Sequence, residues 1–209
     1  MGINDRKDRD KEDLKKKILT AARELFLVKG FENTSIRNIA EKIEYSPTSI
    51  YLHFKDKDDL FHALHSEGFE LLNAQFSTLH AVRDPFERLI AMGRIYMQFA
   101  VENPELYELM FIHTAPIDSL DMHKGEEWLE GKTSFEGLTM TIEGCIQAGY
   151  FKFPNTEVAA YMIWSFMHGM ISLKICHRCA KVLSEVNQED ILPKSFDAFV
   201  TMLEQLRSS

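Results

Sequence analysis

Residues 18–60 read ILTAARELFLVKGFENTSIRNIAEKIEYSPTSIYLHFKDKDDL. Apolar residues recur every three or four positions at its start, which is the period of an α-helix with one buried face. This stripe comprises Leu14, Ile18, Ala22, Leu25 and Phe26. Gly30 can adopt positive φ, so we expect the first helix to end there. The stretch therefore predicts an amphipathic first helix and, by the signals that follow it, a helical fold.

Two short helices are predicted after Gly30. Thr34 and Ser35 offer hydroxyl groups that can cap the second helix. Ser46 followed by Pro47 is typical of a helix start, because proline at the first helical position loses no hydrogen bond. The third helix should then end near residue 54.

This third helix is too short to be stable by propensity alone. Packing must hold it, and Ile50 and Phe54 have the spacing to face inward. The side chains left outside are Thr48, Ser49, Leu52 and His53. Small polar residues at an exposed helix N-terminus allow close approach to base edges in the major groove, so the pattern predicts a helix-turn-helix DNA reader.

The same stretch resembles the N-terminal domain of the tetracycline-repressor (TetR) family. The matching positions are Ala22, Leu25, Phe26, Gly30, Thr34, Ile39, Ala40, Tyr51, His53, Phe54, Lys57 and Leu60. The resemblance implies that Arg37, together with Thr34 or Ser35, contacts phosphate and a base edge. It also implies DNA contacts from the third helix and its C-terminal flank, through Pro47, Thr48, Ser49, Tyr51, His53 and Lys57.

The remainder of the chain also predicts helices. Starts are signalled at residues 56, 84–85, 103–104, 155–156 and 193–195, and no alternating strand pattern is longer than a few residues. The sequence therefore predicts an all-α protein of about nine helices. We expect a helix-turn-helix domain with a charged N-terminal extension over residues 1–57, and a larger ligand-binding and dimerisation domain over residues 58–209.

Two features of the larger domain resemble the WHG-type C-terminal domain of part of this family. They are the sequence NPELYELMF at residues 103–111 and the set Trp164, His168 and Gly169. The helix expected over residues 156–176 is apolar on every side, so it should be covered on every side. We expect it to form a four-helix homodimer interface with the last helix, whose stripe is Phe196, Phe199, Val200, Leu203 and Leu206.

Nine of the ten methionines follow residue 91. Methionine adapts to irregular shapes, which favours a pocket for a small apolar effector, although ordinary core packing explains the same residues. The candidate pocket residues are His113, Phe135, Glu143, Gln147, Trp164, Met167 and His168.

Charge is divided unevenly along the chain. Residues 1–60 carry 13 Lys and Arg against 12 Asp and Glu, whereas the remainder carries 11 against 20. The start of the sequence is dense in charge, so we expect no signal peptide there, and the 16-residue charge-free segment 158–173 is too short to span a bilayer. Three cysteines fit a reducing cytoplasm, and one CxxC pair at Cys176 and Cys179 supplies too few ligands for zinc.

No catalytic constellation is recognisable. The sequence contains no nucleophile elbow, metal-ligand spacing or glycine-rich phosphate loop, so we expect neither enzyme activity nor a cofactor or metal. The preferred hypothesis is a cytoplasmic, dimeric, operator-binding repressor that a small apolar effector releases. A transcriptional activator, and a helical ligand carrier that does not bind DNA, are the alternatives.

Overall fold

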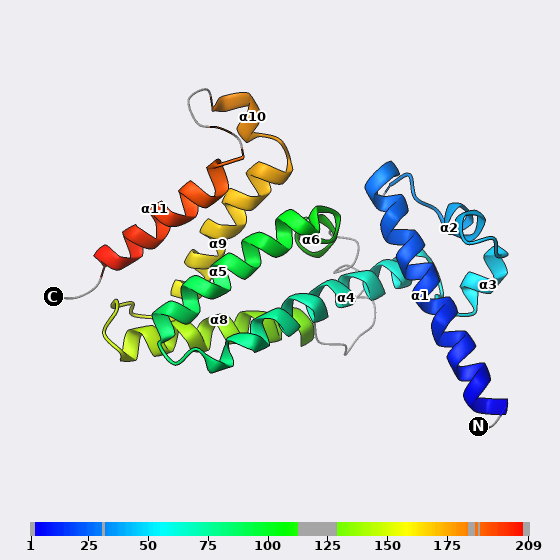
Figure 1. Cartoon of the computed structure of the whole chain (residues 1–209), viewed down its shortest axis with the longest axis horizontal. Helices are drawn as coiled ribbons and strands as arrows, with labels where there is room; N and C mark the ends of the chain where they lie inside the picture. Colours follow the sequence, from blue (N-terminus) through cyan, green and yellow to red (C-terminus); the bar gives the residue numbers. More distant parts are fainter. Residues whose placement is uncertain (1–2, 31, 113–128, 184–186, 188, 207–209) are drawn as a thin grey trace. The chain divides into compact units, whose positions relative to one another are not determined.

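The structure is a computed structural model that describes residues 3–30, 32–112, 129–183, 187 and 189–206. Helices are the only regular elements within these ranges, so the prediction of an all-α fold is confirmed (Figure 1). The elements are α1 (Ile3–Lys29), α2 (Ile36–Lys42), α3 (Pro47–Tyr51), α4 (Lys57–Ser77), η1 (Thr78–Ala81), α5 (Pro85–Glu102), α6 (Pro104–Phe111), α8 (Leu129–Gln147), α9 (Thr156–Ile175), α10 (Cys179–Val182) and α11 (Ile191–Gln205).

The chain divides into two compact units, which we call the head and the body. The head comprises residues 1–68 and 105–127, and the body comprises residues 69–104 and 128–209. The chain therefore passes from one unit to the other inside α4, at the start of α6 and after residue 127. The domain boundary expected between residues 57 and 58 stays a prediction.

One hydrophobic cluster holds the head together. It contains Ile18 of α1, Ile39 of α2, Ile50 of α3 and Leu60 of α4, all with no exposed surface. Leu109 of α6 joins the same cluster, although α6 is far from the other helices in the sequence. Burying these side chains stabilises the head by about 1.5–3 kcal/mol for each large residue.

Gly68 allows α6 to pack closely on α4. A Cβ atom at this position would lie 2.5 Å from Sδ of Met110 and 2.7 Å from Cδ2 of Leu106. Those distances are shorter than real contacts, so a larger residue at position 68 would require the Met110 and Leu106 side chains to shift.

The body packs α5, α8, α9 and α11 around a second apolar core. Asp84 caps α5 by accepting hydrogen bonds from the amides of residues 86 and 87, and Asn155 caps α9 by accepting one from residue 158. Both caps were predicted. The last helix begins at Ile191, before the predicted start at residues 193–195, with Asp190 as an N-cap that makes no side-chain hydrogen bond.

Much of the surface of α9 is exposed. Among the described residues it is the one helix whose length and composition would allow it to cross a membrane, and 28% of that apolar window is buried. Its exposed large apolar residues are Val158, Tyr161, Met162, Phe166 and Leu173. Core helices of soluble proteins can have the same length and composition, but they are usually covered. The expectation that α9 is covered on every side is therefore not met within a single chain.

Candidate nucleic-acid interface

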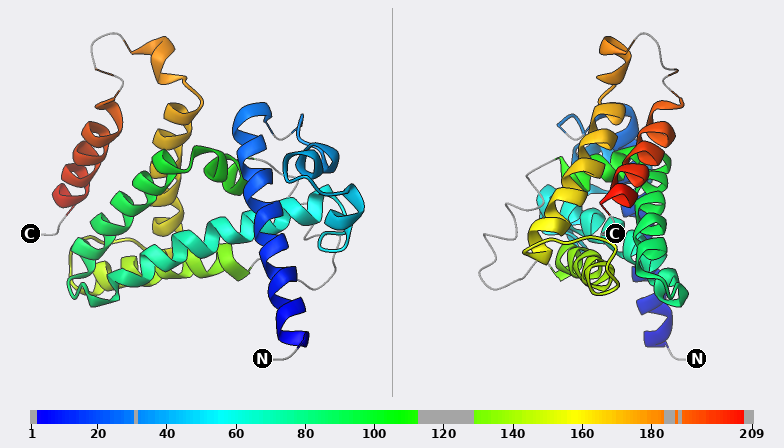
Figure 2. Two further views of the ribbon diagram at one scale, coloured as in Figure 1. Left: turned by 45° about the vertical axis from the view of Figure 1, so that its right-hand side comes forward. Right: turned by 90° about the vertical axis from the view of Figure 1, so that its left-hand side faces the viewer.

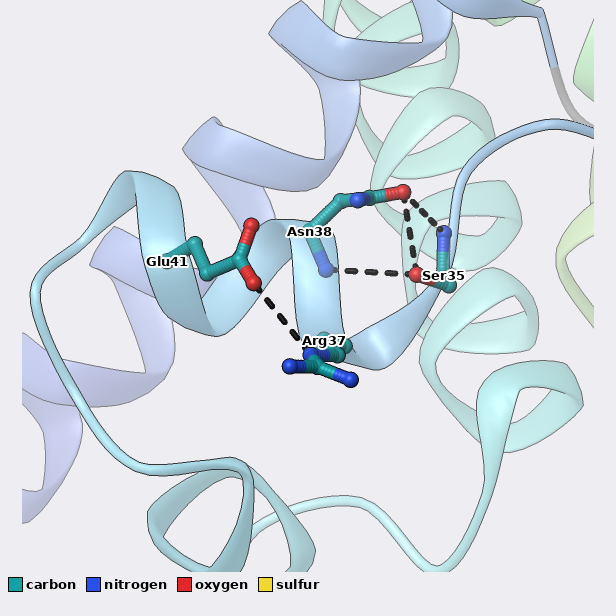
Figure 3. A network of polar contacts seen from close by, with 4 residues as sticks. All are labelled: Ser35, Arg37, Asn38 and Glu41. Atoms are coloured by element: carbon teal, nitrogen blue, oxygen red, sulfur yellow. Dashed lines mark hydrogen bonds and ion pairs between the residues drawn. The ribbon is translucent and has the colours of Figure 1, made fainter.

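The N-terminus of α2 is built by a capping box. The Ser35 hydroxyl accepts a hydrogen bond from the Asn38 amide at 3.2 Å, and the Asn38 side chain accepts one from the Ser35 amide at 3.3 Å. Figure 3 shows these contacts. They satisfy backbone donors that would otherwise lack partners in the first turn, which explains why the short helix begins here.

Arg37 lies on the exposed side of α2. Its Nε atom is 3.3 Å from Oε1 of Glu41, and the two side chains are 82% and 64% exposed (Figure 3). An exposed ion pair of this kind contributes little to stability. The guanidinium group is therefore accessible to an anionic partner such as a phosphate.

Thr34 is buried, whereas its neighbour Ser35 is exposed. The Thr34 side chain is 1% exposed and its hydroxyl donates a hydrogen bond to the carbonyl of Gly30 at 2.8 Å. The prediction that Thr34 offers its hydroxyl to DNA is not supported, because that group is used to join the end of α1 to the start of α2. Of the two alternatives, Ser35 is the exposed residue.

α3 begins as predicted. The Ser46 hydroxyl accepts a hydrogen bond from the Ser49 amide at 3.2 Å and lies 3.0 Å from the Ser49 hydroxyl, with Pro47 at the first helical position. The helix ends at Tyr51, three residues before the predicted end at Phe54, which the chain reaches through a turn.

The two faces of α3 have different environments. Ile50 is fully buried, and Phe54 beyond the helix is 3% exposed. Pro47 and Thr48 are exposed, and Tyr51 is 54% exposed. The apolar residues therefore hold the helix in place while its N-terminal turn and the tyrosine stay accessible, as a major-groove reader requires.

A tight turn between α2 and α3 determines the orientation of α3 relative to α2. Glu44 adopts φ 61, and the amide of Tyr45 donates a hydrogen bond to the Ala40 carbonyl at 3.0 Å. A left-handed conformation is costly for a residue with a Cβ atom. No glycine in the sequence marks this turn, so sequence reasoning did not identify the strained position.

His53 and Lys57 follow α3. Burial lowers the pKa of His53 below its ordinary value, and the positive charges of Lys11 and Lys15 lower it further. Lys57 is the first residue of α4, and its Nζ atom lies 5.3 Å from the centre of the Phe61 ring. The structure thus places Ser35, Arg37 and the α3 residues together in the head; the DNA contacts of these residues stay predictions.

The body brings three of the predicted pocket residues together around Tyr96 of α5. Nε1 of Trp164 donates a hydrogen bond to the Tyr96 hydroxyl at 3.3 Å, and that hydroxyl lies 3.3 Å from Nδ1 of His168. Phe135 makes an edge contact with Trp164, with ring centres 6.2 Å apart. Sequence reasoning missed Tyr96, although its position in the apolar stripe of α5 is a signal that could have identified it.

The other pocket candidates are placed differently. Met167 is 4% exposed and belongs to the core. Glu143 and Gln147 are exposed, and Nε2 of Gln147 donates to Oε1 of Glu143 at 3.3 Å. The structure does not bring these two into the Tyr96 cluster, because their side chains bond to each other on the exposed side of α8. His113 lies outside the described residues.

The arrangement of α1 to α4 defines a helix-turn-helix DNA-binding protein. Residues 18–64 match the family model described as bacterial regulatory proteins of the tetR family. Residues 89–203 match the model described as a tetracyclin repressor-like C-terminal domain. The chain therefore belongs to the TetR family of transcriptional regulators. That family consists of regulators and not enzymes, as expected from the sequence. The WHG type of the C-terminal domain stays a prediction.

Relatives extend the likeness over nearly the whole chain. The HTH-type transcriptional regulator YvkB of Bacillus subtilis is 42% identical over 187 residues, which is 88% of this chain and 94% of YvkB. A TetR-family regulator from Syntrophomonas wolfei superposes with a TM-score of 0.71 at 24% identity, covering 93% of this chain and 96% of that one. The fatty acid degradation regulator FadR of Bacillus halodurans superposes with a TM-score of 0.68 at 18% identity, covering 92% of this chain and 93% of that one. At these identities, both structures show a likeness of fold alone.

Proposed function

We propose that the protein is a cytoplasmic, homodimeric repressor that binds an operator through α3 and leaves it when a small apolar effector binds the body. The observation that carries the DNA-binding part is the two-sided environment of α3. Ile50 holds the helix from within, while Thr48 and Tyr51 stay accessible on its outer side. Such a helix can enter a major groove without unfolding any part of the head.

The exposed apolar face of α9 supports a homodimer. Tyr161 and Met162 are 61% and 54% exposed, and Ser165 and Gly169 on the same face leave room for a second helix to approach. Soluble proteins rarely leave large apolar patches uncovered, and a twofold copy presents the same patch in return. A symmetric dimer would place two α3 helices on half-sites about 34 Å apart.

The contribution of α11 to this interface differs from the expected one. Phe196, Phe199 and Leu203 are 3–6% exposed, and Phe199 stacks on Phe166 with ring centres 4.2 Å apart. These residues fill the core of their own body. The exposed large apolar residues at the end of α11 are Met202 and the C-cap residue Leu206, which lie one turn apart and can face a second copy.

The Tyr96 cluster supports an effector site in the body. Tyr96, Trp164 and His168 supply hydrogen-bonding groups, as does Ser172, whose hydroxyl lies 3.3 Å from Nε2 of His168, and small-molecule sites use such groups to fix orientation. Because FadR of Bacillus halodurans is described as a fatty acid degradation regulator, a fatty-acyl compound is the first effector to test.

A signal from the body must reach α3 through the chain segments that join the two units. α4 and α6 are such segments, and they pack closely on each other where Gly68 meets Leu106 and Met110. An effector that prefers the released state a hundredfold shifts the equilibrium by about 2.7 kcal/mol.

DNA binding is tested by selecting an operator from genomic fragments and measuring its affinity by fluorescence anisotropy. Tyr51→Phe removes one hydroxyl and should weaken binding about tenfold, as for one hydrogen bond to a phosphate. Tyr45→Phe, in the α2–α3 turn and 43% exposed, is the matched control and should bind like the wild type. Failure to retain any duplex at low salt would overturn the proposal and favour a ligand carrier.

Repression and effector release are tested on the same operator. Acyl compounds of increasing chain length should lower the operator affinity, and Tyr96→Phe should change the concentration needed. A compound that binds the body and raises the operator affinity would contradict release.

A further inference from the structure

The C-terminal half of α4 packs in the body through apolar residues and one amide side chain. Phe69 and Leu72 are 2% and 1% exposed, and Asn73 beside them is half-buried. Figure 2 shows this half of α4 running alongside α8, as Figure 1 does. Apolar contacts are not directional, so they tolerate small shifts along a helix axis, whereas a hydrogen bond depends on its distance and angle. The bonds of Asn73 therefore matter for the register of α4 on α8.

Both ends of the Asn73 amide are bonded to α8. Its Nδ2 atom donates a hydrogen bond to the carbonyl of Glu130 at 3.1 Å, and its Oδ1 atom accepts one from the Ser134 hydroxyl at 2.6 Å. The Ser134 hydroxyl lies 3.2 Å from the same Glu130 carbonyl, so the amide binds two adjacent groups within one turn of α8. Sliding or rotating α4 against α8 would strain both bonds together. Asn73 therefore fixes the register of the two helices.

The same turn of α8 also contacts the Tyr96 cluster. Phe135 follows Ser134 directly, and its ring makes an edge contact with Trp164, with ring centres 6.2 Å apart. Trp164 in turn donates a hydrogen bond to the Tyr96 hydroxyl at 3.3 Å. Consecutive residues of a helix point about 100° apart, so one turn can contact two different neighbours. Packed helical turns transmit strain, so a displacement of Phe135 is passed to the bonds of Ser134.

We propose that Asn73 is a positioning residue that couples the Tyr96 cluster to operator binding, by transmitting displacements of residues 134–135 to α4. The inference rests on the proposed function, because the coupling has an effect only if the head binds DNA. α4 continues from Asn73 into the head, where Leu60 and Leu64 belong to the cluster that holds α3. Coupling between two sites is reciprocal, so operator binding should alter the Tyr96 cluster as a ligand of the cluster alters operator binding.

Trp164 can report this coupling without any effector. The sequence has two tryptophans, so Trp128→Phe leaves Trp164 as the single indole. Its fluorescence should change when the operator duplex selected from genomic fragments saturates the protein, because indole emission depends on its hydrogen bond and on the rings around it. In this background, Asn73→Leu and Ser134→Ala should each reduce the change by about half or more. Duplex binding itself should persist in the anisotropy assay, because neither residue is expected to contact DNA.

A neighbouring hydroxyl provides the matched control. Thr133 is exposed, and its hydroxyl donates to the carbonyl of Leu129 in its own helix at 2.8 Å. Thr133→Ala should therefore keep the full fluorescence change. Ser134→Thr retains a hydroxyl and should restore most of what Ser134→Ala loses. The double variant N73L/S134A should lose no more than Asn73→Leu alone, since the two residues act through one contact.

Three outcomes would overturn the coupling role of Asn73. They are an undiminished fluorescence change in Asn73→Leu and Ser134→Ala, an equal loss in Thr133→Ala, and a Trp164 signal that does not respond to bound operator in the Trp128→Phe background. A protein that binds no duplex would instead overturn the proposed function, so the two failures are distinguishable.

Discussion

The head and the body differ in how far they bury their large apolar side chains. In the head, the buried apolar residues of α1, α2, α3 and α4 share one cluster, although Val28 of α1 and Tyr51 of α3 are exposed. In the body, α9 leaves Tyr161, Met162 and Phe166 more than 40% exposed. The comparison supports the proposal that a second chain covers the apolar face of α9, whereas the core of the head closes within one chain.

The largest expected effect comes from placing charge on the exposed face of α9. The double variant Tyr161→Glu and Met162→Glu should dissociate the dimer and weaken operator binding by about 100-fold or more, because two linked heads bind with a high effective concentration. Sedimentation velocity measures the oligomeric state, and fluorescence anisotropy measures the operator affinity. Met140→Glu is the control, since Met140 is 65% exposed on α8. A double variant that stays dimeric would show that the body is covered elsewhere.

The closed core of the head predicts the next effect. Ile50→Ala removes the fully buried residue that holds α3, and should lower the free energy of unfolding by about 3 kcal/mol. Leu52→Ala, at a side chain 74% exposed, should change it by less than about 0.5 kcal/mol. Urea denaturation followed by circular dichroism measures both. Similar losses in the two variants would mean that α3 is not held by this core.

A smaller effect is expected at the turn between α2 and α3. Glu44 has φ 61, so Glu44→Gly should raise the free energy of unfolding by up to about 1 kcal/mol by relieving strain. Glu41→Gly, within α2, should lower it by about the same amount. Thermal unfolding of the two variants shows whether each substitution raises or lowers the free energy of unfolding. Destabilisation by both would show that the side chain of Glu44 matters more than its backbone.

The smallest effect concerns the interior of the body. Burial lowers the pKa of His168, so the folded state disfavours the charged ring. The free energy of unfolding should therefore fall as the pH drops below about 6.5, the unfolded value, and level off below the folded pKa. His168→Gln should flatten that dependence, whereas His80→Gln, at an exposed residue, should preserve it. Chemical denaturation of the wild type and of both variants at several pH values measures this pH dependence.

The helix starts were the most predictable features, because a cap needs residues that are adjacent in the sequence. Ser35, Ser46 and Asp84 each accept amide hydrogen bonds from residues two or three positions later. The start of α11 was predicted too late because Asp190 makes no such bond, and nothing local marks it. The candidate site was predictable to the same extent: the exposed residues of α3 follow from its period and from its short length.

Contacts between distant residues were less predictable. Thr34 was read as a DNA contact because its position matches the family, but its hydroxyl bonds to Gly30 and its side chain is buried. Glu143 and Gln147 were read as pocket residues from their polarity, but they bond to each other on the exposed side of α8. A residue type shows what a side chain can do, while its surroundings decide which partner it has.

The sequence by itself determined the helical class, the caps, the helix-turn-helix segment and the family, because these depend on spacing along one chain. Only the tertiary structure decided that α6 joins the head core through Leu109 and that Tyr96 connects Trp164 with His168. These features join residues separated by more than 30 positions. Their proximity results from the packing of whole helices, which no local pattern of residues encodes.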